Sequence, residues 1–272
     1  MLVKDVMATG NVLTAREEDD LALTTQMMAW ANVRHLPVLA GDEVTGLLTE
    51  RELLLHRQDQ ASVKVAEVMN RNVALAFPDE PLSEAIARMV ETQNECLPVV
   101  EDHRLVGLLT PLDVLAHETG APQTALPGGR ARSFPPVEEV MKHDPATVHG
   151  QHLLLDAAAL MAALNVRHVP VVGDRGQLLG MLSDRDIRNR IGDPWSALHE
   201  PEVRARVRDL RVWTAMTCPA VCVPASANMG DAVARLIEDR VGVVVVIDRE
   251  ERPIGILSYV DALRALSTTP PH

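Results

Sequence analysis

The sequence predicts a mixed α/β (α+β) fold made of four β-α-β-β-α repeats, which pair into two modules with pseudo-two-fold symmetry. Three observations predict it. One short pattern occurs four times, and its marker glycines stand 61, 73 and 75 residues apart. A Val-Met or Ala-Met pair precedes each copy. A stretch rich in Pro and Gly separates the first two copies from the last two, as is typical of a linker.

Each copy of the pattern holds an apolar segment and then a second segment that runs from Gly to Thr or Ser. In repeat 1 these are residues 33–38 and 46–49, and in repeat 3 they are residues 166–171 and 180–183. Four ordered matches of this kind indicate an internal repeat. The marker glycines are Gly46, Gly107, Gly180 and Gly255, and the repeats begin at Val6-Met7, Val68-Met69, Val140-Met141 and Ala215-Met216.

The first elements of each repeat are expected to be a short extended segment and a helix. Residues 11–14 and 145–148 are the expected extended segments of repeats 1 and 3. In repeat 2, apolar residues recur at three- and four-residue steps, which is the period of a helix with one buried face. They are Leu82, Ile86, Met89 and Val90.

Polar residues mark the expected ends of these first helices. Ser83 and Asp156 stand near helix starts, where a short polar side chain can cap backbone N–H groups. Asn32, Asn94 and Asn165 stand where the helices should end, because Asn tolerates the left-handed conformation used there.

Two strands and a second helix are expected to complete each repeat. Residues 169–172 and 178–182 are typical strands joined by a Gly/Asp turn, and residues 113–118 are an example of the closing helix. The continuously apolar run 243–247 is typical of a strand that is covered on both faces. One repeat is too short to bury much of its surface, so we expect repeats to pair.

The expected domain organisation follows from the repeats. Module 1 comprises residues 1–118, with repeats at about 1–60 and 61–118, and the linker comprises residues 119–136. Module 2 comprises residues 137–272, with repeats at about 137–192 and 211–267 and an insertion at 193–210. The Arg-rich segment 202–208 of this insertion is expected to form a surface helix.

Composition excludes several classes of partner. Acidic residues outnumber basic ones 38 to 26, a net charge of −12, which disfavours nucleic acid and anionic membranes. Aromatic residues make up 2%, too few for a stacking platform. We expect a cytoplasmic protein, since the N-terminus does not resemble a signal peptide and no apolar run approaches the roughly 20 residues of a membrane span. Three cysteines are too few for a disulfide scaffold.

The repeated residues resemble those of cystathionine-β-synthase (CBS) domains. The resemblance rests on the Val-Met start, the His-x-Pro-Val strand and the Gly-x-x-Thr/Ser-x-x-Asp turn, and it covers nearly the whole chain. Four CBS units in two pairs resemble a tandem Bateman-module protein. The resemblance implies that adenosine-containing ligands bind in clefts between paired units and that the bound ligand is reported to a partner. A homodimer is expected, since two-fold oligomers are the commonest kind.

The turn at the end of each second strand is the expected ribose site. A carboxylate at a helix start can accept hydrogen bonds from both ribose hydroxyls. The Thr or Ser three residues earlier offers its hydroxyl and nearby N–H groups to a phosphate. Repeat 1 departs from the pattern, because Glu52 follows Thr49. A helix cap is the alternative role for these acids. The matching pairs are Thr110 and Asp113, Ser183 and Asp186, and Ser258 and Asp261.

The expected phosphate side lies in repeats 1 and 3, where Arg-His precedes the Pro-Val strand and a further Arg follows in the later turn. Family geometry implies that each cleft takes its carboxylate from one repeat and its cations from the paired one. Asp113 then joins Arg34, His35 and Arg51, whereas Asp261 joins Arg167, His168 and Arg185. Arginine can bind phosphate through two parallel hydrogen bonds. The alternative for each of these arginines is a solvated or salt-bridged surface residue.

The other two clefts are expected to be weaker. Glu52 would face Glu95 and Cys96 without a cation. Ser183 and Asp186 would face Val241 and Gly242, which suits a nucleoside better than a polyphosphate.

The adenine is expected to lie between short aliphatic walls, because aromatic residues are absent from the expected base sites. These walls are formed by backbone contacts near Val12 and Ala146.

The sequence therefore predicts a regulatory protein that senses AMP, ADP or ATP, with Mg²⁺ able to accompany a polyphosphate. Three alternatives stay open: another adenosine ligand (S-adenosylmethionine, NAD or a cyclic dinucleotide), an interaction scaffold with vestigial clefts, and an enzyme that would have to use His35 or His168. We expect no catalytic residue and no metal site. Cys218 and Cys222 lack a second pair of ligands, and His143, His149 and His152 are typical of exposed loops.

Overall fold

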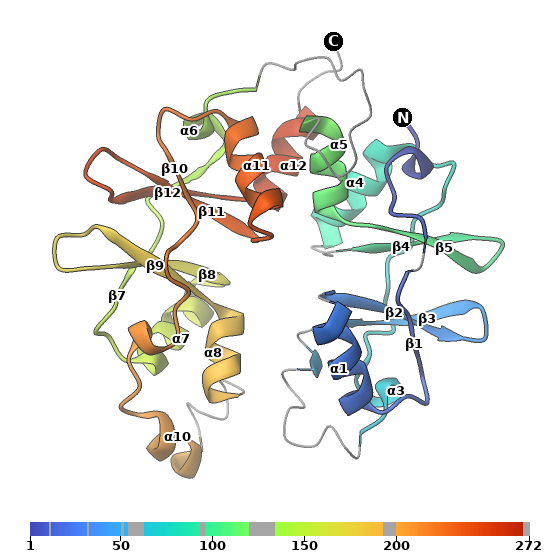
Figure 1. The fold of residues 1–272 in the computed structure, drawn as a ribbon, viewed down its shortest axis with the longest axis horizontal. Helices are drawn as coiled ribbons and strands as arrows, with labels where there is room; N and C mark the ends of the chain where they lie inside the picture. The colour runs from blue at the N-terminus through green and yellow to red at the C-terminus, as the bar shows by residue number, and fades with distance from the viewer. Residues whose placement is uncertain are drawn as a thin grey trace. The chain divides into compact units, whose positions relative to one another are not determined.

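The computed structural model describes residues 1–10, 12–31, 33–49, 52–53, 63–92, 96–119, 134–192 and 200–268. It confirms the mixed α/β class. Its contacts divide the chain into two compact units, which are drawn in Figure 1. Unit 1 comprises Met1–Glu118 and Leu263–His272, and unit 2 comprises Thr119–Ala262. The module and linker boundaries expected from the sequence stay predictions.

Unit 1 contains two repeats, each with a hairpin of antiparallel strands. In repeat 1 the sheet order is β1-β2-β3, with β1 parallel to β2. In repeat 2, β4 pairs with β5, and Ala76 makes a parallel bridge to Val99. The elements are η1 (Val3–Asp5), β1 (Ala15–Arg16), α1 (Leu21–Ala31), β2 (His35–Ala40), β3 (Glu43–Thr49), α3 (Val65–Val68), α4 (Leu82–Thr92), β4 (Leu97–Glu101), β5 (Arg104–Leu109) and α5 (Pro111–Thr119).

Unit 2 contains repeats 3 and 4 with the same order of elements and an added helix between them. Its sheets have the orders β7-β8-β9 and β10-β11-β12-β6. Its elements begin with α6 (Val137–Val140), β6 (Lys142–His143), β7 (Val148–His149), α7 (Leu154–Leu164), β8 (His168–Val172), β9 (Leu178–Ser183) and α8 (Asp184–Ile191). They continue with α10 (Pro201–Val207), η2 (Val212–Thr214), β10 (Cys222–Pro224), α11 (Met229–Glu238), β11 (Val243–Ile247), β12 (Pro253–Ser258) and the start of α12 (Tyr259–Thr268), whose residues from Leu263 on are counted in unit 1.

The start of each repeat pairs with the second hairpin strand of the other repeat in the same unit. Four residues, each directly after the Met of a repeat start, make this pairing in one common register. The pairs are Ala8 with Leu108, Asn70 with Leu47, Lys142 with Ile256, and Thr217 with Met181. Each second-strand partner directly follows a marker glycine. The two repeats of a unit are therefore joined reciprocally.

The marker glycines make room for the methionines of the repeat starts. A Cβ at Gly107 would lie 2.8 Å from Met7 Sδ, and one at Gly180 would lie 3.0 Å from Met216 Sδ. These distances are shorter than van der Waals contact. The methionines at Gly46 and Gly255 are Met69 and Met141, and both are buried. The two sequence markers are thus the two sides of one contact that occurs four times.

The apolar elements fill the cores as the sequence predicts. Strand β11 is an apolar run whose Val244, Val245 and Val246 are fully buried. Helix α4 buries Leu82, Ile86 and Met89, as its period requires. The insertion forms α10, which packs Val207 against Leu155 while its arginines stay exposed.

Some local predictions were wrong. The first paired strand of repeat 1 begins at Ala15, directly after the expected extended segment, whereas that of repeat 3 begins at Val148, the last residue of the expected segment. Before Ala15, Val12 N–H donates to the Gly10 carbonyl at 2.8 Å. Asp156 does not cap α7, because the capping position belongs to Leu153 and Asp156 lies inside the first turn. There its charge favours the positive end of the helix dipole.

The predicted helix end at Asn165 is confirmed by its left-handed conformation, with φ 51° and ψ 43°. Asn32 and Asn94 lie outside the described residues.

Candidate functional site

The Thr/Ser-x-x-Asp turns are reciprocal caps at the starts of α5, α8 and α12. Each Asp Oδ2 accepts a hydrogen bond from the backbone N–H of the Thr or Ser, at 2.8 Å for Asp113, 2.8 Å for Asp186 and 3.0 Å for Asp261. The Thr or Ser hydroxyl donates to the same oxygen at 2.5–2.6 Å. The Asp N–H donates back to that hydroxyl at 3.2–3.3 Å.

Glu52 accepts the same two hydrogen bonds in repeat 1 despite its longer side chain. Its Oε2 accepts from Thr49 N–H at 2.9 Å and from the Thr49 hydroxyl. The helix-cap role is therefore present in all four repeats. In the three Asp repeats the cap uses Oδ2 of the carboxylate and does not need Oδ1. A rigidly held carboxylate with an oxygen beyond the cap's needs is suited to accept hydrogen bonds from hydroxyls.

The carboxylates differ in their surroundings. Burial raises the pKa of Asp113 above its ordinary value, and the two hydrogen bonds from Thr110 oppose this rise. The Asp261 side chain is 7% exposed, and its Oδ1 lies 3.4 Å from Lys142 Nζ. Lys142 comes from repeat 3, so this ion pair joins the two repeats of unit 2.

The Arg-His pairs lie where the first hairpin strand begins. His35 is paired with Thr49, and His168 with Ser183, so each pair flanks the cap of its own repeat. Arg34 and Arg167 are exposed, and both histidines are half-buried. The Arg167 carbonyl accepts from Asp184 N–H at 2.9 Å, next to Arg185 in the first turn of α8. Arg51 lies outside the described residues, as do Glu50 and Glu95.

The His168 ring reaches from repeat 3 to repeat 4. A Cβ placed on Gly242 would lie 3.7 Å from His168 Cε1 and 3.6 Å from Tyr259 Cε1. Tyr259 directly follows Ser258, and its N–H donates to the Gly242 carbonyl at 3.3 Å. The structure thus brings His168 close to the turn that carries Asp261, although His168 is paired with the Ser183 side of its own repeat.

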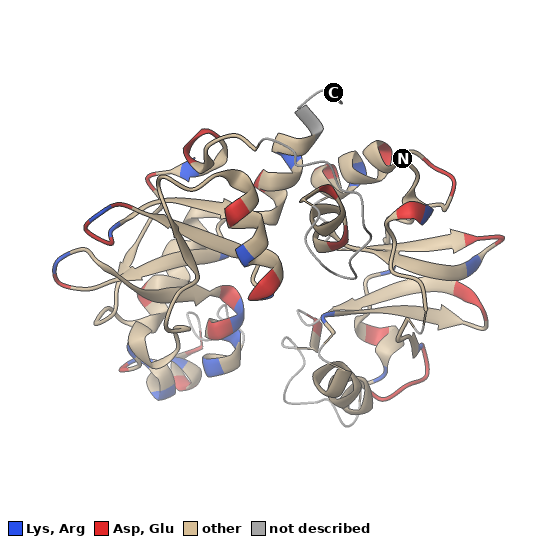
Figure 2. Cartoon of the chain, turned by 45° about the horizontal axis from the view of Figure 1, so that its top comes forward, with Lys and Arg blue, Asp and Glu red and all other residues tan. Residues whose placement is uncertain are grey.

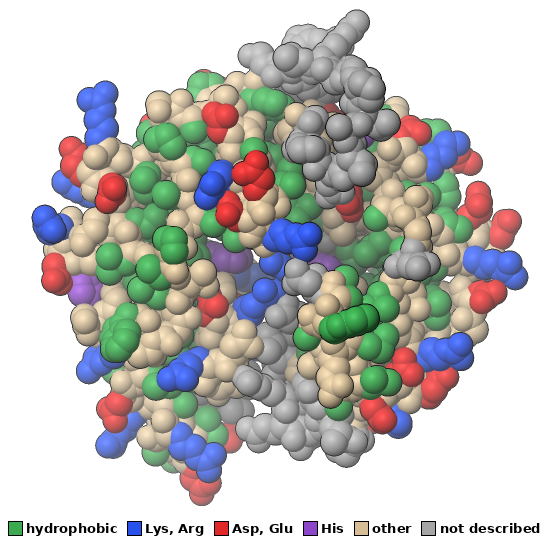
Figure 3. Space-filling view, in the orientation of Figure 1, with side chains coloured by type: hydrophobic (Ala, Val, Ile, Leu, Met, Phe, Trp, Pro, Cys, Tyr) green, Lys and Arg blue, Asp and Glu red, His purple; other side chains and the backbone are tan. Residues whose placement is uncertain are grey.

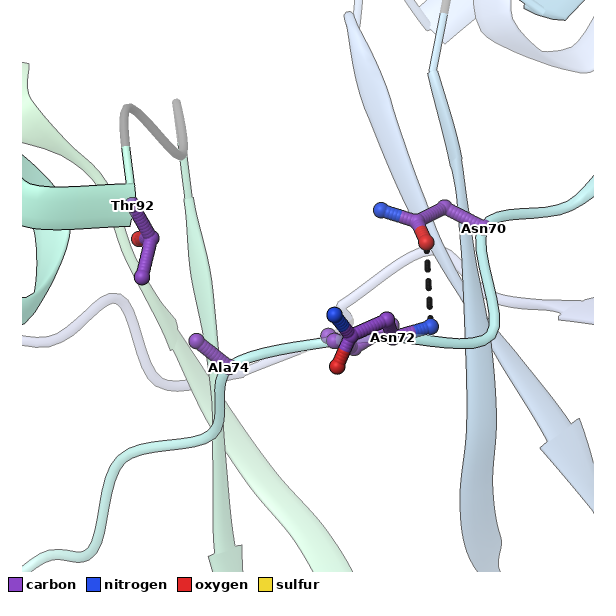
Figure 4. A pocket seen from close by; sticks show the side chains of 5 residues that line it. Asn70, Asn72, Ala74 and Thr92 are labelled. Atoms are coloured by element: carbon purple, nitrogen blue, oxygen red, sulfur yellow. Dashed lines mark hydrogen bonds between the residues drawn. The ribbon is translucent and has the colours of Figure 1, made fainter.

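A cavity of about 280 Å³ lies along the segment that follows Met69 (Figure 4). Figure 4 shows Thr92 at the end of α4 on one side and Asn70 on the other, beside the strands of repeat 1. The Asn70 side-chain oxygen accepts from Asn72 N–H at 3.0 Å. The lining is polar but uncharged, and it consists of Asn70, Asn72, Val73, Ala74 and Thr92.

A second cavity, of about 370 Å³, holds the predicted base-wall residue Val12. Its walls come from the hairpin ends of the two repeats, where Asp42 and Arg104 form an ion pair at 3.3 Å. Arg34 and His35 stand at the opposite end of β2 from this hairpin. The lining residues are Gly10, Val12, Thr14, Leu39, Asp42, Arg104, Leu105 and Val106.

Some lining residues were missed by sequence reasoning although the repeat register contains them. Ala74 stands five residues after Met69, as Val12 does after Met7 and Ala146 after Met141. Ala146 itself is half-buried. Lys142 was also missed, because its importance depends on a pairing between repeats that only the structure reveals.

Within the described part of the chain, His, Cys, Asp and Glu form no group of three or more that could hold a metal ion. His149 instead contacts Asp174 at 3.0 Å. The described helices include none that is both long and apolar enough to cross a membrane.

Comparison with protein families identifies the repeats. The CBS domain profile matches four segments, residues 3–59, 65–120, 137–193 and 207–268. The chain belongs to the CBS domain family. The resemblance inferred from the repeated motifs is thereby confirmed, with four CBS domains along the chain.

Relatives of the chain include uncharacterised and enzymatic CBS proteins. Over 192 residues it is 27% identical to the uncharacterised protein MJ1225 of Methanocaldococcus jannaschii, covering 68% of each chain. It is 26% identical to MJ1404 of the same organism but spans 42% of that protein. It is 31% identical over 147 residues to an inosine-5'-monophosphate dehydrogenase of Korarchaeum cryptofilum, of which it spans 28%. The similarity to the dehydrogenase is therefore partial and concerns its CBS region.

Two solved structures share the fold over nearly the whole chain. The crystal structure of MJ1225, proposed to be an archaeal homologue of γ-AMPK, has a TM-score of 0.77 at 19% identity and covers 98% of this chain and all of its own. An uncharacterised conserved protein from Pyrococcus horikoshii has a TM-score of 0.65 at 18% identity, with the same coverage. The CBS fold is thus shared along the chain.

Proposed function

We propose that this CBS protein is a regulatory sensor without catalytic activity, which binds adenosine nucleotides (AMP, ADP or ATP) between paired CBS domains. Each unit would hold one phosphorylated nucleotide, with Asp113 and Asp261 as the ribose acceptors. Binding would change the conformation of the unit or its affinity for a protein partner. A cytoplasmic location and a homodimer belong to the same proposal.

The reciprocal caps carry the proposal. A cap fixes each carboxylate at a helix N-terminus and commits one of its oxygens, so the ribose hydroxyls would meet an acceptor that is already ordered. The helix N-terminus favours a negative group, and the Arg-His pairs supply further positive charge for the phosphate. Mg²⁺ could accompany a polyphosphate. Similarity to MJ1225, itself proposed to be an archaeal homologue of γ-AMPK, supports a regulatory rather than a catalytic role.

Binding of AMP, ADP and ATP to purified protein tests the proposal, by thermal shift and by calorimetric titration. A ligand that binds only the folded state raises the melting temperature, because it contributes RT ln(1 + [L]/Kd) to stability. We expect such a rise in the wild type. In Arg167→Ala/His168→Ala, nucleotide affinity at the second unit should fall about tenfold, since charged hydrogen bonds contribute about 1.5–3 kcal/mol each before solvent screening weakens them.

The matched control is Arg204→Ala/Arg206→Ala, which removes two exposed arginines on α10. It should leave nucleotide affinity unchanged. If AMP, ADP and ATP all fail to shift the wild-type melting temperature, the proposal that the protein senses these nucleotides is wrong. An interaction scaffold is favoured if the other adenosine ligands also fail to shift it.

A different adenosine ligand is the second candidate, favoured by the cavity beside Asn70 and Thr92. Its lining is uncharged, so it suits a base or another neutral group better than a phosphate. S-adenosylmethionine, NAD and a cyclic dinucleotide therefore belong in the same titrations. Binding that is unchanged in Arg167→Ala/His168→Ala but weakened in Asn70→Ala/Thr92→Ala would favour this second candidate.

A further inference from the structure

Lys142 forms an ion pair with Asp261, the carboxylate of the capped turn in repeat 4. Lys142 is the residue directly after the Met of repeat 3. Its Nζ lies 3.4 Å from Asp261 Oδ1, the carboxylate oxygen that the Ser258 cap does not use. The lysine side chain is 62% exposed, whereas that of Asp261 is 7% exposed. An exposed cation thus contacts a buried acceptor.

The four repeats give an internal comparison for this contact. In every repeat, the residue directly after the Met of the repeat start takes the position of Lys142. Its backbone pairs with the residue that follows the marker glycine of the other repeat in the same unit. Ala8 takes this position toward the Asp113 cap, Asn70 toward Glu52 and Thr217 toward Asp186. Of the four side chains, only lysine is cationic and long enough to extend along the strand to the cap. The difference therefore depends on one side chain on a shared backbone.

The ammonium group and the ribose hydroxyls compete for the same kind of acceptor. Both are hydrogen-bond donors, and a nucleoside that binds Asp261 through Oδ1 must displace Lys142. After displacement, the lysine is a flexible point charge close to the bound ligand. When a nucleotide binds, the lysine can form a new ion pair with the phosphate. When a nucleoside binds, no new ion pair replaces the one that Lys142 made with Asp261.

We propose that Lys142 is a specificity-determining residue that makes the Asp261 site discriminate against unphosphorylated nucleosides more strongly than the Asp113 site does. The inference rests on the proposed function, because it assumes that the capped carboxylates bind ribose. Beyond that function, the Asp261 site is assigned a preference for nucleotides over unphosphorylated nucleosides. Figure 2 shows basic residues at the hairpin ends and on helices of unit 2, and Lys142 lies on β6 of this unit.

The test compares adenosine with AMP at each site of the full-length chain. In an Asp113→Asn background, which leaves the Asp261 site, Lys142→Met should tighten adenosine binding about two- to fivefold, since a partly exposed ion pair is weak. AMP should gain less or bind more weakly, so the ratio of AMP to adenosine affinity falls. Asn keeps the acceptor that the Thr110 cap requires, so the background variant is conservative.

The reciprocal variant transfers the lysine to unit 1. In an Asp261→Asn background, Ala8→Lys should weaken adenosine binding at Asp113 by a similar factor and raise the ratio of AMP to adenosine affinity. The control is Lys4→Met, which breaks an exposed ion pair with Asp79 away from the caps. It should change neither affinity.

The outcomes separate the two proposals. If wild-type protein binds AMP but the affinity ratio does not change in either the Lys142→Met or the Ala8→Lys variant, the role of Lys142 is overturned and the sensor function stands. If the wild type binds neither adenosine nor AMP, the proposed function fails, and the inference fails with it. A higher ratio in Lys142→Met also contradicts the inference.

Discussion

At the scale of single residues, the caps show how one carboxylate can be both structural and functional. Each of four carboxylates caps the start of a helix by accepting hydrogen bonds from the backbone N–H and the hydroxyl of the Thr or Ser three residues earlier. They belong to Asp113, Asp186, Asp261 and Glu52. From the sequence, helix capping and ligand binding were alternative roles for these carboxylates. The geometry makes them compatible, because the cap requires only one of the two carboxylate oxygens.

The Asp113→Asn variant tests how the burial of the Asp113 carboxylate changes the stability of the folded protein with pH. Burial raises the pKa of Asp113 in the folded protein. As pH rises from below the ordinary pKa of 3.8 through the raised folded value, ionisation therefore costs the folded state more than the unfolded state. Over this pH range the wild type therefore becomes less stable toward unfolding, whereas the neutral Asp113→Asn variant does not lose stability for this reason. The melting temperature of Asp113→Asn minus that of wild type should become more positive as pH rises.

The control for this prediction is Asp231→Asn. Asp231 accepts from Asn228 N–H at 3.0 Å in the same type of cap, at the exposed start of α11. It measures the effect of removing a capping charge from the surface. A difference for Asp113→Asn that becomes more negative with rising pH would contradict the prediction.

At the scale of elements, each repeat is joined to its neighbour by a methionine packed on a glycine. The contact explains why these two residue types recur at fixed places in the sequence. All three of the nearest atoms that a Cβ at Gly255 would meet belong to the Met141 side chain. At Gly107 one of the three is the backbone oxygen of Ala8, 2.9 Å away.

Gly255→Ala should therefore destabilise unit 2 by about 1–3 kcal/mol, the usual cost of overpacking. The cost should be smaller in a Met141→Ala background, because the clashing atoms are gone. Gly107→Ala should be rescued less by Met7→Ala, since the clash with the Ala8 backbone remains. Urea unfolding of the single and double variants measures these couplings.

Gly150→Ala is the matched control, because a Cβ there would meet its nearest neighbours at an ordinary 3.7 Å. It should cost less than Gly255→Ala. Equal costs for Gly255→Ala with and without Met141 would show that the clash lies elsewhere.

The repeats made most elements predictable, but not the pairing between repeats. The hairpin strands, the helix α4 and the cap at Asn165 follow from local periodicity and residue type. The bounds of the two-residue strands β1 and β7 were not predicted, because so short a strand has no period and its position is set by its partner strand. The site was predictable as far as the caps. The reach of Lys142 to Asp261 depends on contacts between distant segments, which no local pattern contains.

At the scale of the whole molecule, a chain with a net charge of −12 must bind anions against its own field. Figure 3 shows basic and acidic side chains interspersed over the visible surface. The basic side chains that could bind a phosphate occur at equivalent positions of repeats 1 and 3. They are Arg34 and His35 in unit 1, and Arg167, His168 and Arg185 in unit 2. This placement argues for one nucleotide in each unit and not four in the chain.

Calorimetric titration with ATP should therefore saturate at two nucleotides per chain, under the assumption that each unit binds one. Asp113→Asn and Asp261→Asn should each reduce the number to one, because each removes one charged ribose acceptor. Asp186→Asn should leave it at two, since Asp186 is expected to lie opposite the uncharged Val241 and Gly242. Both sites should weaken as salt is raised, because the attraction between exposed arginines and phosphate is screened. Saturation at four, or a loss of one site in Asp186→Asn, would mean that the arginines do not decide which clefts are occupied.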